Sequence, residues 1–272
     1  MSWSLPDWLG ELESRARGAG PLLVLLDFDG TLAPIAERPG GAALPADTRR
    51  CLQRLSVSPR VALGVISGRG IEDLRRRVAI EGLIYAGNHG MEIRGRGLSF
   101  IEPGADASRA ALHDLVTRIR EELSVHPGVE VEDKGLTASV HYRGAGGDSL
   151  GSVRGVVERV VRESPSGFRW SEGRMVYELR PDVQWNKGSA VEWLRRRLGV
   201  PADRTVFIGD DATDEDAFRV LGDGITIRVG PVARSLARYH LRDPAQVTEL
   251  LGWLLGVMDS PHRTPMERES RT

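Results

Sequence analysis

The chain has 272 residues, of which 40% are hydrophobic and 28% charged, and its formal net charge is −1 at pH 7. This length suits one large domain or two modest ones. The near-neutral balance provides no field that would gather nucleic acid or an anionic membrane, so we expect neither as a partner. The single cysteine, Cys51, excludes a disulfide framework and a thiolate metal cluster, and we expect it to be a small core residue.

The first segment, residues 3–19, carries tryptophan and leucine at roughly helical spacing and predicts an amphipathic helix packed on the core. It is acidic and lacks a basic start followed by an apolar run, so it does not resemble a signal peptide. No segment approaches the roughly 18 consecutive apolar residues that a membrane helix needs. We therefore expect a cytoplasmic protein.

Residues 22–26, LLVLL, predict a strand buried on both faces of a parallel sheet. Asp27 and Asp29 follow it two positions apart, which directs both side chains to the same side. Gly30 permits a sharp turn, and Thr31 adds a hydroxyl group. Two close carboxylates repel each other unless a cation or a shared proton compensates, so the stretch indicates a functional site. An acidic turn without a function is the alternative.

A loop rich in Pro, Gly and Ala covers 34–44, and Asp47 is the expected N-cap of a helix that extends to Leu55. The next strand, 61–66, ends in Ser67, Gly68 and Arg69. A hydroxyl and free amides before a helical pattern at 71–78 suit an anion, although Ser67 could serve only as an N-cap. A third strand within 82–93 runs into Asn88 and His89. The arginine runs at 75–77 and 195–197 are interpreted as solvated helix faces.

A different pattern follows, with two helices and four strands. It predicts an antiparallel sheet that carries two helices. We interpret it as a domain inserted over residues 104–181, with hinges near 102–104 and 180–182, where prolines interrupt regular structure. Its predicted elements are a helix at 106–124, strands at 129–133 and 137–142, a helix at 150–163, and strands at 168–171 and 175–180.

The first pattern then resumes. Its elements are a helix at 187–198, a strand at 205–208, an acidic turn leading into a helix, a strand at 225–229 and a helix at 245–256. Strands that alternate with helices predict an α/β fold with a doubly wound parallel sheet, built from residues 1–103 and 182–272. The tail from about residue 260 to 272 is predicted to be disordered.

Ligands of such sheets lie beyond the carboxyl ends of the strands. Five polar residues occupy predicted strand ends: Asp27, Asp29, Ser67, Asn88 and Asp210. Oxygen ligands suit Mg²⁺, which we expect as the cofactor. The candidate metal-site residues are Asp27, Asp29, Asp210, Asp211 and Asp214, with Asp211 and Asp214 holding either waters or the Lys187 ammonium.

The same residues suit phosphoryl transfer, which depends on positioning and on neutralising the phosphate oxygens. Asp27 would attack phosphorus, and Asp29 would give a proton to the leaving alcohol and later take one from water. Thr31, Ser67 and Lys187 would hold the phosphate oxygens.

Four motifs are similar to those of the haloacid dehalogenase superfamily of aspartate-nucleophile phosphotransferases, and they occur in that family's order. They are DFDGTL at 27–32, SGR at 67–69, NKG at 186–188 and GDDATDEDAF at 209–218. Asp29 resembles the second aspartate of the phosphatase branch. The resemblance implies a Rossmann-like core and an aspartyl-phosphate intermediate.

The inserted region resembles the C2-type cap of that superfamily, and three stretches resemble the trehalose-6-phosphate phosphatase family. These are GNHGMEIR at 87–94, VEDKGLTASVHYR at 131–143 and VYELRPDVQWNKG at 176–188. The resemblance implies a small sugar phosphate as substrate and a cap that closes over it. The substrate-binding residues it implies are Gly68, Arg69, Asn88, His89, Lys134, His141, Glu178 and Arg180. Each also has a structural alternative: Glu178 and Arg180 could simply pair, and Lys134 could lie in an exposed turn.

Three other functions remain as alternatives. The first is a phosphatase of another glycosyl phosphate, such as glucosylglycerol phosphate or a glycosyl-3-phosphoglycerate. A receiver-like phospho-aspartate signalling module is disfavoured by the inserted domain and by Asp29, and a sugar-binding protein without catalysis by the intact Asp27, Lys187 and Asp210. The GAGG stretch at 144–147 lacks a strand-to-helix setting, so we expect no dinucleotide cofactor. We expect a monomer or a weak oligomer.

Overall fold

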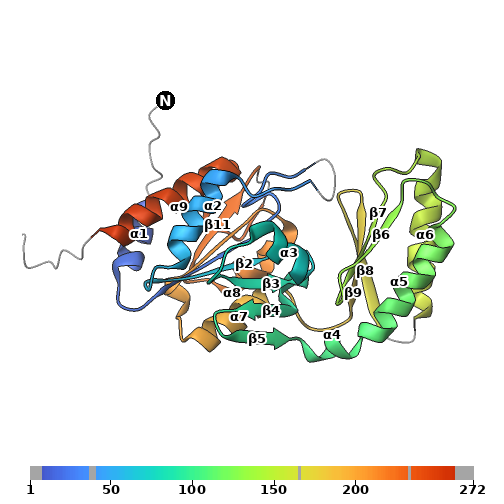
Figure 1. The fold of residues 1–272 in the computed structure, drawn as a ribbon, viewed down its shortest axis with the longest axis horizontal. Helices are drawn as coiled ribbons and strands as arrows, with labels where there is room; N and C mark the ends of the chain where they lie inside the picture. Colours follow the sequence, from blue (N-terminus) through green and yellow to red (C-terminus); the bar gives the residue numbers. More distant parts are fainter. Residues whose placement is uncertain (1–7, 37–40, 165–166, 232–233, 261–272) are drawn as a thin grey trace, which may run out of the picture.

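The computed structural model describes residues 8–36, 41–164, 167–231 and 234–260, which form two sheets with their helices (Figure 1). The larger sheet has eight strands in the order β12-β11-β10-β1-β2-β3-β4-β5. Its strands are β1 (Leu22–Leu26), β2 (Val61–Ile66), β3 (Ile84–Gly87), β4 (Glu92–Gly95), β5 (Leu98–Ile101), β10 (Thr205–Gly209), β11 (Ile225–Val229) and β12 (Tyr239–Leu241). Strands β12 to β3 are parallel, and β4 and β5 extend the sheet in antiparallel fashion.

Helices cover both faces of this sheet. One face packs on α1 (Leu9–Arg17), α2 (Ala46–Ser56), α3 (Ile71–Val78) and α9 (Pro244–Asp259), and the other on α7 (Lys187–Leu198) and α8 (Glu215–Val220). Strand β1 is buried along its whole length because alternate side chains serve the two cores: Leu22, Val24 and Leu26 on one face, Leu23 and Leu25 on the other. The doubly wound α/β fold is therefore confirmed.

Several local expectations need correction. Pro45, not Asp47, is the N-cap of α2, because Asp47 already lies in the first helical turn. Cys51 is only half buried at the rim of the core. The β4–β5 hairpin was not expected at all. Residues 3–7 of the predicted first helix and the predicted tail after residue 260 lie outside the described residues. Within the described part, no helix combines the length and apolarity needed to cross a membrane.

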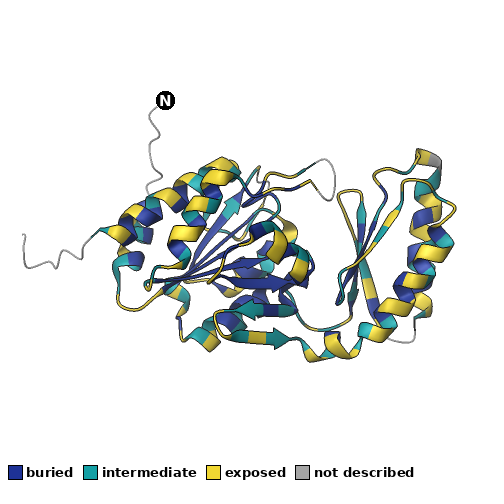
Figure 2. Cartoon of the chain, in the orientation of Figure 1, coloured by how far each residue is buried: buried dark blue, intermediate teal, exposed yellow. Residues whose placement is uncertain are grey.

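The smaller sheet has four antiparallel strands in the order β6-β7-β9-β8. They are β6 (Glu130–Asp133), β7 (Ala138–His141), β8 (Phe168–Gly173) and β9 (Val176–Pro181). A short helix, α4 (Pro103–Ala107), precedes α5 (Arg109–Leu123), which with α6 (Leu150–Glu163) covers one face of this sheet around a hydrophobic cluster of its own. Tyr177 and Leu179 of β9 are buried in that cluster, whereas Glu178 and Arg180, which alternate with them, are not. The polar face turns toward the larger sheet (Figures 1 and 2).

The larger sheet and its helices form one lobe of the molecule, and the smaller sheet and its helices form the other. The turn between β6 and β7 contacts the lobe of the larger sheet directly. The Thr137 hydroxyl donates to Asn88 Oδ1 at 2.7 Å, and Asn88 Nδ2 donates to the Lys134 carbonyl at 3.3 Å. Leu136 packs beside Met91 and Ala105 in a small buried cluster. The two lobes are therefore joined by this turn as well as by the chain.

Candidate active site

A cleft of about 1300 Å³ lies between the carboxyl ends of the parallel strands and the polar face of the smaller sheet. All four sequence motifs contribute to its lining. The sequence-predicted residues that line it are Asp27, Asp29, Ser67, Gly68, Arg69, His89, Lys134, His141, Glu178, Arg180, Lys187, Asp210 and Asp211. Three further predicted residues, Thr31, Asn88 and Asp214, are not part of the lining and are buried or bonded beneath it.

Three carboxylates from two segments, one after β1 and one after β10, meet at the floor of this cleft. Each of Asp27, Asp210 and Asp214 offers an oxygen, and these oxygens lie within 4.8 Å of one another. The Lys187 ammonium, only 2% exposed, donates to Asp27 Oδ1 and Asp214 Oδ1 at 2.7 Å each. Asp214 Oδ2 accepts the backbone N–H groups of Asp210 and Asp211 at 2.9 Å. Asp214 therefore fixes both the lysine and the loop that carries Asp210.

Residues just after β1 hold the Asp210 side chain in place. The Thr31 hydroxyl donates to Asp210 Oδ1 at 2.8 Å. Gly30 has a φ of +85°, and a Cβ atom there would lie 2.0 Å from Asp210 Oδ2. Only glycine therefore permits the two segments to approach so closely.

The cluster contains three carboxylates and one ammonium, and burial and mutual repulsion shift the pKa values of these groups. Burial raises the pKa of Asp27 well above its ordinary value, and Asp214 and Asp210 add to the rise while Lys187 opposes it. Burial also raises the pKa of Asp210 to about 6. The pKa of Lys187 is raised by Asp214 and Asp27 although burial alone would lower it. The excess of negative charge and the hard oxygen donors of the three carboxylates fit a divalent cation such as Mg²⁺.

Asp29 and Asp211 lie outside this cluster of three carboxylates. Arg69 Nε donates to Asp29 Oδ2 and Arg69 Nη2 to Asp29 Oδ1, both at 2.7 Å. Asp211 Oδ1 accepts the N–H of Ala212 at 2.6 Å and begins the short helix η4 (Ala212–Asp214). Ser67 is buried at the end of β2 and accepts the N–H of Arg69 at 3.2 Å.

His89 is held in an unusual backbone conformation within the short helix η1 (Asn88–Gly90). Asn88 and His89 have left-handed φ values of 51° and 58°. The ring is 8% exposed, and its nitrogens are buried without a partner in the described part of the chain. Burial lowers the pKa of His89 well below its ordinary value, and the charges of Arg180, Lys187 and Lys134 lower it further. The ring is therefore a neutral imidazole whose hydrogen-bonding groups face no protein partner.

Polar side chains on and beside the smaller sheet form hydrogen bonds with one another. These bonds differ from the structural alternatives considered from the sequence. The Lys134 ammonium donates to both Glu178 oxygens at 3.2 and 3.3 Å and to the Gly68 carbonyl at 3.3 Å. The Ser139 hydroxyl donates to Glu178 Oε1 at 2.8 Å, and Arg180 donates to Ser171 at 3.3 Å. Glu178 thus pairs with Lys134 and not with Arg180, and Lys134 does not lie in an exposed turn.

Glu132 is a cleft residue that sequence reasoning did not single out. It lies 3.2 Å from His141 Nε2 and lines the cleft beside it. The period of two along a strand places Glu132 on the same side of β6 as Lys134, and this signal was available in the sequence. Ser139, two positions before His141 on β7, was also not singled out; it is buried beneath the cleft, and its hydroxyl donates to Glu178.

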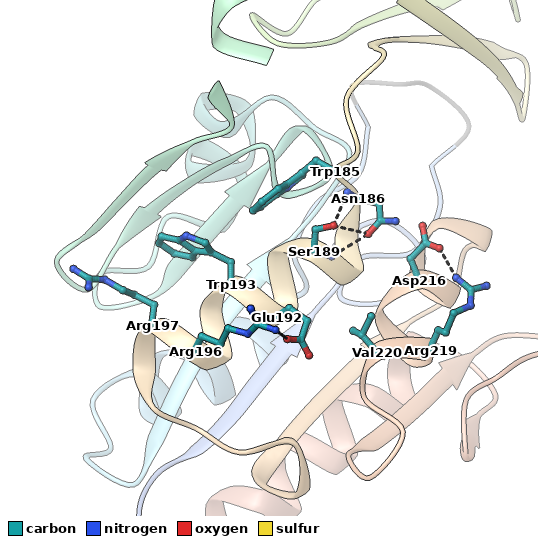
Figure 3. A pocket seen from close by; sticks show the side chains of 10 residues that line it. All are labelled: Trp185, Asn186, Ser189, Glu192, Trp193, Arg196, Arg197, Asp216, Arg219 and Val220. Carbon is teal, nitrogen blue, oxygen red and sulfur yellow. Dashed lines mark hydrogen bonds and ion pairs between the residues drawn. The ribbon is translucent and has the colours of Figure 1, made fainter. Parts of the chain in front are cut away.

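A second depression of about 730 Å³ lies on the outer side of α7 and α8 (Figure 3). Its acidic groups are already paired, Glu192 with Arg196 at 3.1 Å and Asp216 with Arg219 at 2.8 Å. Asn186 and Ser189 cap the start of α7 there. None of the clustered carboxylates lines it, so the cleft between the lobes is the candidate active site.

A comparison with protein-family models matches residues 25–245 to a family described as trehalose-phosphatase. The chain belongs to this trehalose-phosphatase family. The match includes every residue of the candidate site, from Asp27 to Asp214.

Two individual relatives illustrate the similarity, and only the first carries a trehalose-phosphatase name. The chain is 37% identical over 243 residues to a trehalose-phosphate phosphatase of Mycobacterium marinum, covering 85% of this chain and 60% of that protein. It is also 38% identical over 266 residues to an uncharacterized glycosyl hydrolase of Mycobacterium tuberculosis, covering 92% of this chain and 20% of that protein. The chain thus spans between a fifth and three fifths of the length of these relatives.

Solved structures share the trehalose-phosphatase fold. A trehalose-6-phosphate phosphatase related protein superimposes with a TM-score of 0.77 at 28% identity, covering 88% of this chain and 100% of that chain. A haloacid dehalogenase-like hydrolase from Bacteroides thetaiotaomicron, at 17% identity, has a TM-score of 0.62 and covers 86% of this chain and 99% of that chain. The second likeness concerns the fold alone and places the core among haloacid dehalogenase-like folds.

Proposed function

We propose that this chain hydrolyses trehalose 6-phosphate to trehalose and inorganic phosphate through an aspartyl-phosphate intermediate. The observation that carries the proposal is the buried cluster of Asp27, Asp210 and Asp214 around Lys187, at the floor of a cleft built by the trehalose-phosphatase motifs. Burial of this cluster supports a role in chemistry, because three carboxylates are buried against only one ammonium and strongly shifted pKa values are typical of functional sites.

In the first step, a carboxylate oxygen of Asp27 attacks phosphorus and the bond from phosphorus to the sugar oxygen breaks. Asp29 gives its proton to that departing oxygen. In the second step, Asp29 takes a proton from water, which attacks the phosphoaspartate and releases phosphate. Lys187 holds Asp27 in position and, with Ser67 and Thr31, stabilises the phosphate oxygens and the loop around them.

Mg²⁺ is the proposed cofactor, held by Asp27 and Asp210. When bound, it neutralises charge on the phosphate and on the clustered carboxylates. Asp214 is engaged with Lys187 and two backbone N–H groups, so its proposed role is to support the site rather than to coordinate the ion directly.

We further propose that residues 104–181 form a cap that recognises the sugar and that residues 1–103 and 182–272 form the catalytic core. A disaccharide presents many hydroxyl groups, which need both donors and acceptors. The cleft provides them in Glu132, Lys134, His141, Glu178 and Arg180 of the cap and in His89 of the core. We propose a cytoplasmic monomer or weak oligomer.

The test is phosphate release from trehalose 6-phosphate with and without Mg²⁺, run beside an Asp27→Asn variant. Asparagine preserves shape but removes the attacking charge, so activity should fall at least about 10³-fold. Asp47→Asn, the same change on the exposed surface of α2, is the matched control and should keep full activity. Substantial activity of Asp27→Asn would overturn the nucleophile assignment. Faster turnover of glucosylglycerol phosphate or a glycosyl-3-phosphoglycerate would replace the substrate and keep the mechanism.

A further inference from the structure

Asp29, the proposed proton donor, is held unusually firmly for a side chain that is 38% exposed. Both of its oxygens accept hydrogen bonds from Arg69, one from Nε and one from Nη2, each at 2.7 Å. The guanidinium also lies over the Phe28 ring, 5.5 Å from its centroid. A forked pair of this kind fixes the plane of a carboxylate as well as its position.

Arg69 is in turn fixed by hydrogen bonds to residues other than Asp29. Its Nη1 donates to Asp73 Oδ2 at 2.9 Å, and the same oxygen accepts from Arg77 Nε at 2.6 Å. Arg77 Nη1 donates to the Ala42 carbonyl at 2.8 Å, which ties the series to the loop before α2. We call Arg69, Asp73 and Arg77 the arginine bracket.

The bracket lies on one side of α3 and the turn before it, because its members are four residues apart. The Arg77 side chain is 19% exposed, whereas those of its neighbours Arg75 and Arg76 are 50% and 72% exposed. Arg77 also lines the cleft. The expectation that the 75–77 run is a solvated face is therefore wrong for Arg77. Its side chain is half buried and bonded to Asp73 and to the Ala42 carbonyl.

We propose that the arginine bracket positions the Asp29 carboxyl group for proton delivery to the departing sugar oxygen. The proposal rests on the proposed phosphatase function and assigns Asp73 and Arg77 as positioning residues that act through Arg69. The efficiency of a general acid depends on its placement, and a side chain fixed from two directions keeps that placement as the substrate enters.

The choice of leaving group distinguishes a role in proton delivery from a role in folding or in phosphate binding. The oxygen of a sugar alcohol is a poor leaving group and needs a proton as its bond to phosphorus breaks. The p-nitrophenolate anion is stable and leaves without one. A displaced Asp29 should therefore slow phosphoenzyme formation from a sugar phosphate but not from p-nitrophenyl phosphate.

The experiment measures phosphoenzyme formation by rapid mixing for Arg77→Gln and Asp73→Asn with both substrates. We expect a loss of roughly 10- to 100-fold with trehalose 6-phosphate and a change within about twofold in the p-nitrophenolate burst rate. Arg77→Lys keeps the charge but cannot reach both Asp73 and the Ala42 carbonyl, and it should give an intermediate loss. Arg75→Gln, on the same helix and paired with Glu72, is the matched control and should behave as wild type.

Equal losses on both substrates would overturn the proposal, because they would indicate a general effect on folding or phosphate binding. Unchanged rates on both would overturn it as well. Thermal unfolding reports whether either variant is folded, and the two variants break different links of the bracket, so one folded variant suffices. If the wild-type chain hydrolyses no sugar phosphate, the proposed function itself fails, and this result is distinct from a failure of the bracket.

Discussion

At Gly30, in the candidate active site, backbone conformation and side-chain space both require glycine. Its φ of +85° is left-handed, and a Cβ there would collide with the Asp210 carboxylate. Gly30→Ala should therefore displace Asp210 and remove most phosphatase activity, in addition to about 1–2 kcal/mol of backbone strain. Gly20→Ala is the matched control, because Gly20 has a φ of +82° with nothing within 4 Å of its Cβ position. Phosphate release and urea unfolding measure both. Equal activity in the two variants would contradict this reasoning.

The raised pKa of Asp210 makes metal binding depend on pH. The proton must leave before the carboxylate can bind Mg²⁺, and the pKa of this group is about 6 without metal. The apparent Kd for Mg²⁺ should therefore fall as pH rises through about 6, where Asp210 loses its proton, and the raised pKa of Asp27 should add to this fall. Isothermal titration from pH 4.5 to 8 checks this, and a Kd independent of pH would contradict the assignment.

The same shift affects the folded protein without metal. Because the folded-state pKa of Asp210 is above the ordinary aspartate value of 3.8, the folded state binds this proton more tightly than the unfolded state does. Its contribution to the free energy of unfolding is present below about pH 4 and is lost as pH rises through about 6. Mg²⁺ should restore stability above that pH, because it binds only the folded site.

For single residues, the sequence predicted which side chains lie at strand ends but not the hydrogen bonds that these side chains form. Asp27, Ser67 and Asp210 follow apolar runs, so their arrival at one edge of the sheet followed from the fold. The bonds of Arg69 and Arg77 did not follow, because a run of arginines on a helix is equally typical of a solvated face. Only the orientation of α3 against the sheet distinguishes Arg77 from Arg76.

Strand β9 shows how one element serves both a core and a binding surface. Tyr177 and Leu179 fill the cluster beneath the helices, while Glu178 between them faces the cleft and bonds with Lys134 and Ser139. Because the alternation is strict, a substitution at Glu178 should change recognition with little effect on folding.

Glu178→Ala should reduce kcat/KM for trehalose 6-phosphate by at least about tenfold, chiefly by raising KM, because it removes an acceptor and frees Lys134. Turnover of p-nitrophenyl phosphate, which has no sugar to recognise, should change little. Glu121→Ala, an exposed glutamate on α5, is the control. Steady-state kinetics on both substrates measure the difference, and equal losses would count against a sugar-binding role for β9.

Long elements with strong patterns were predicted well, and short edge strands were not. The helix predicted at 187–198 matches α7, since its apolar spacing and Gly199 mark both body and end. The strands β4, β5 and β12 span three or four residues at or next to the edges of the sheet and are partly exposed, so they lack a hydrophobic period of their own. Their pairing with neighbours depends on the whole sheet.

For the whole molecule, the size of the cleft decides whether the two lobes must move toward each other during catalysis. Its volume of about 1300 Å³ exceeds the roughly 300–1,000 Å³ of ordinary small-molecule sites. A cleft of this size retains water around a disaccharide phosphate, and water competes with a sugar for the polar groups of the cap. The lobes must therefore approach each other if the site is to exclude bulk solvent.

The lobes are joined by residues near 102–104 and 180–182 and by the turn that bears Leu136 and Thr137. We expect closure to pivot at these three points, because the chain connections and the buried Leu136 cluster fix the lobes to each other there. Small-angle scattering of the Asp27→Asn variant, which should bind without turnover, would show a smaller radius of gyration with Mg²⁺ and trehalose 6-phosphate. Inorganic phosphate should not produce the decrease, because it cannot bridge the two lobes. An unchanged radius with trehalose 6-phosphate at saturation would mean that the cap is already in its catalytic position and that specificity arises without closure.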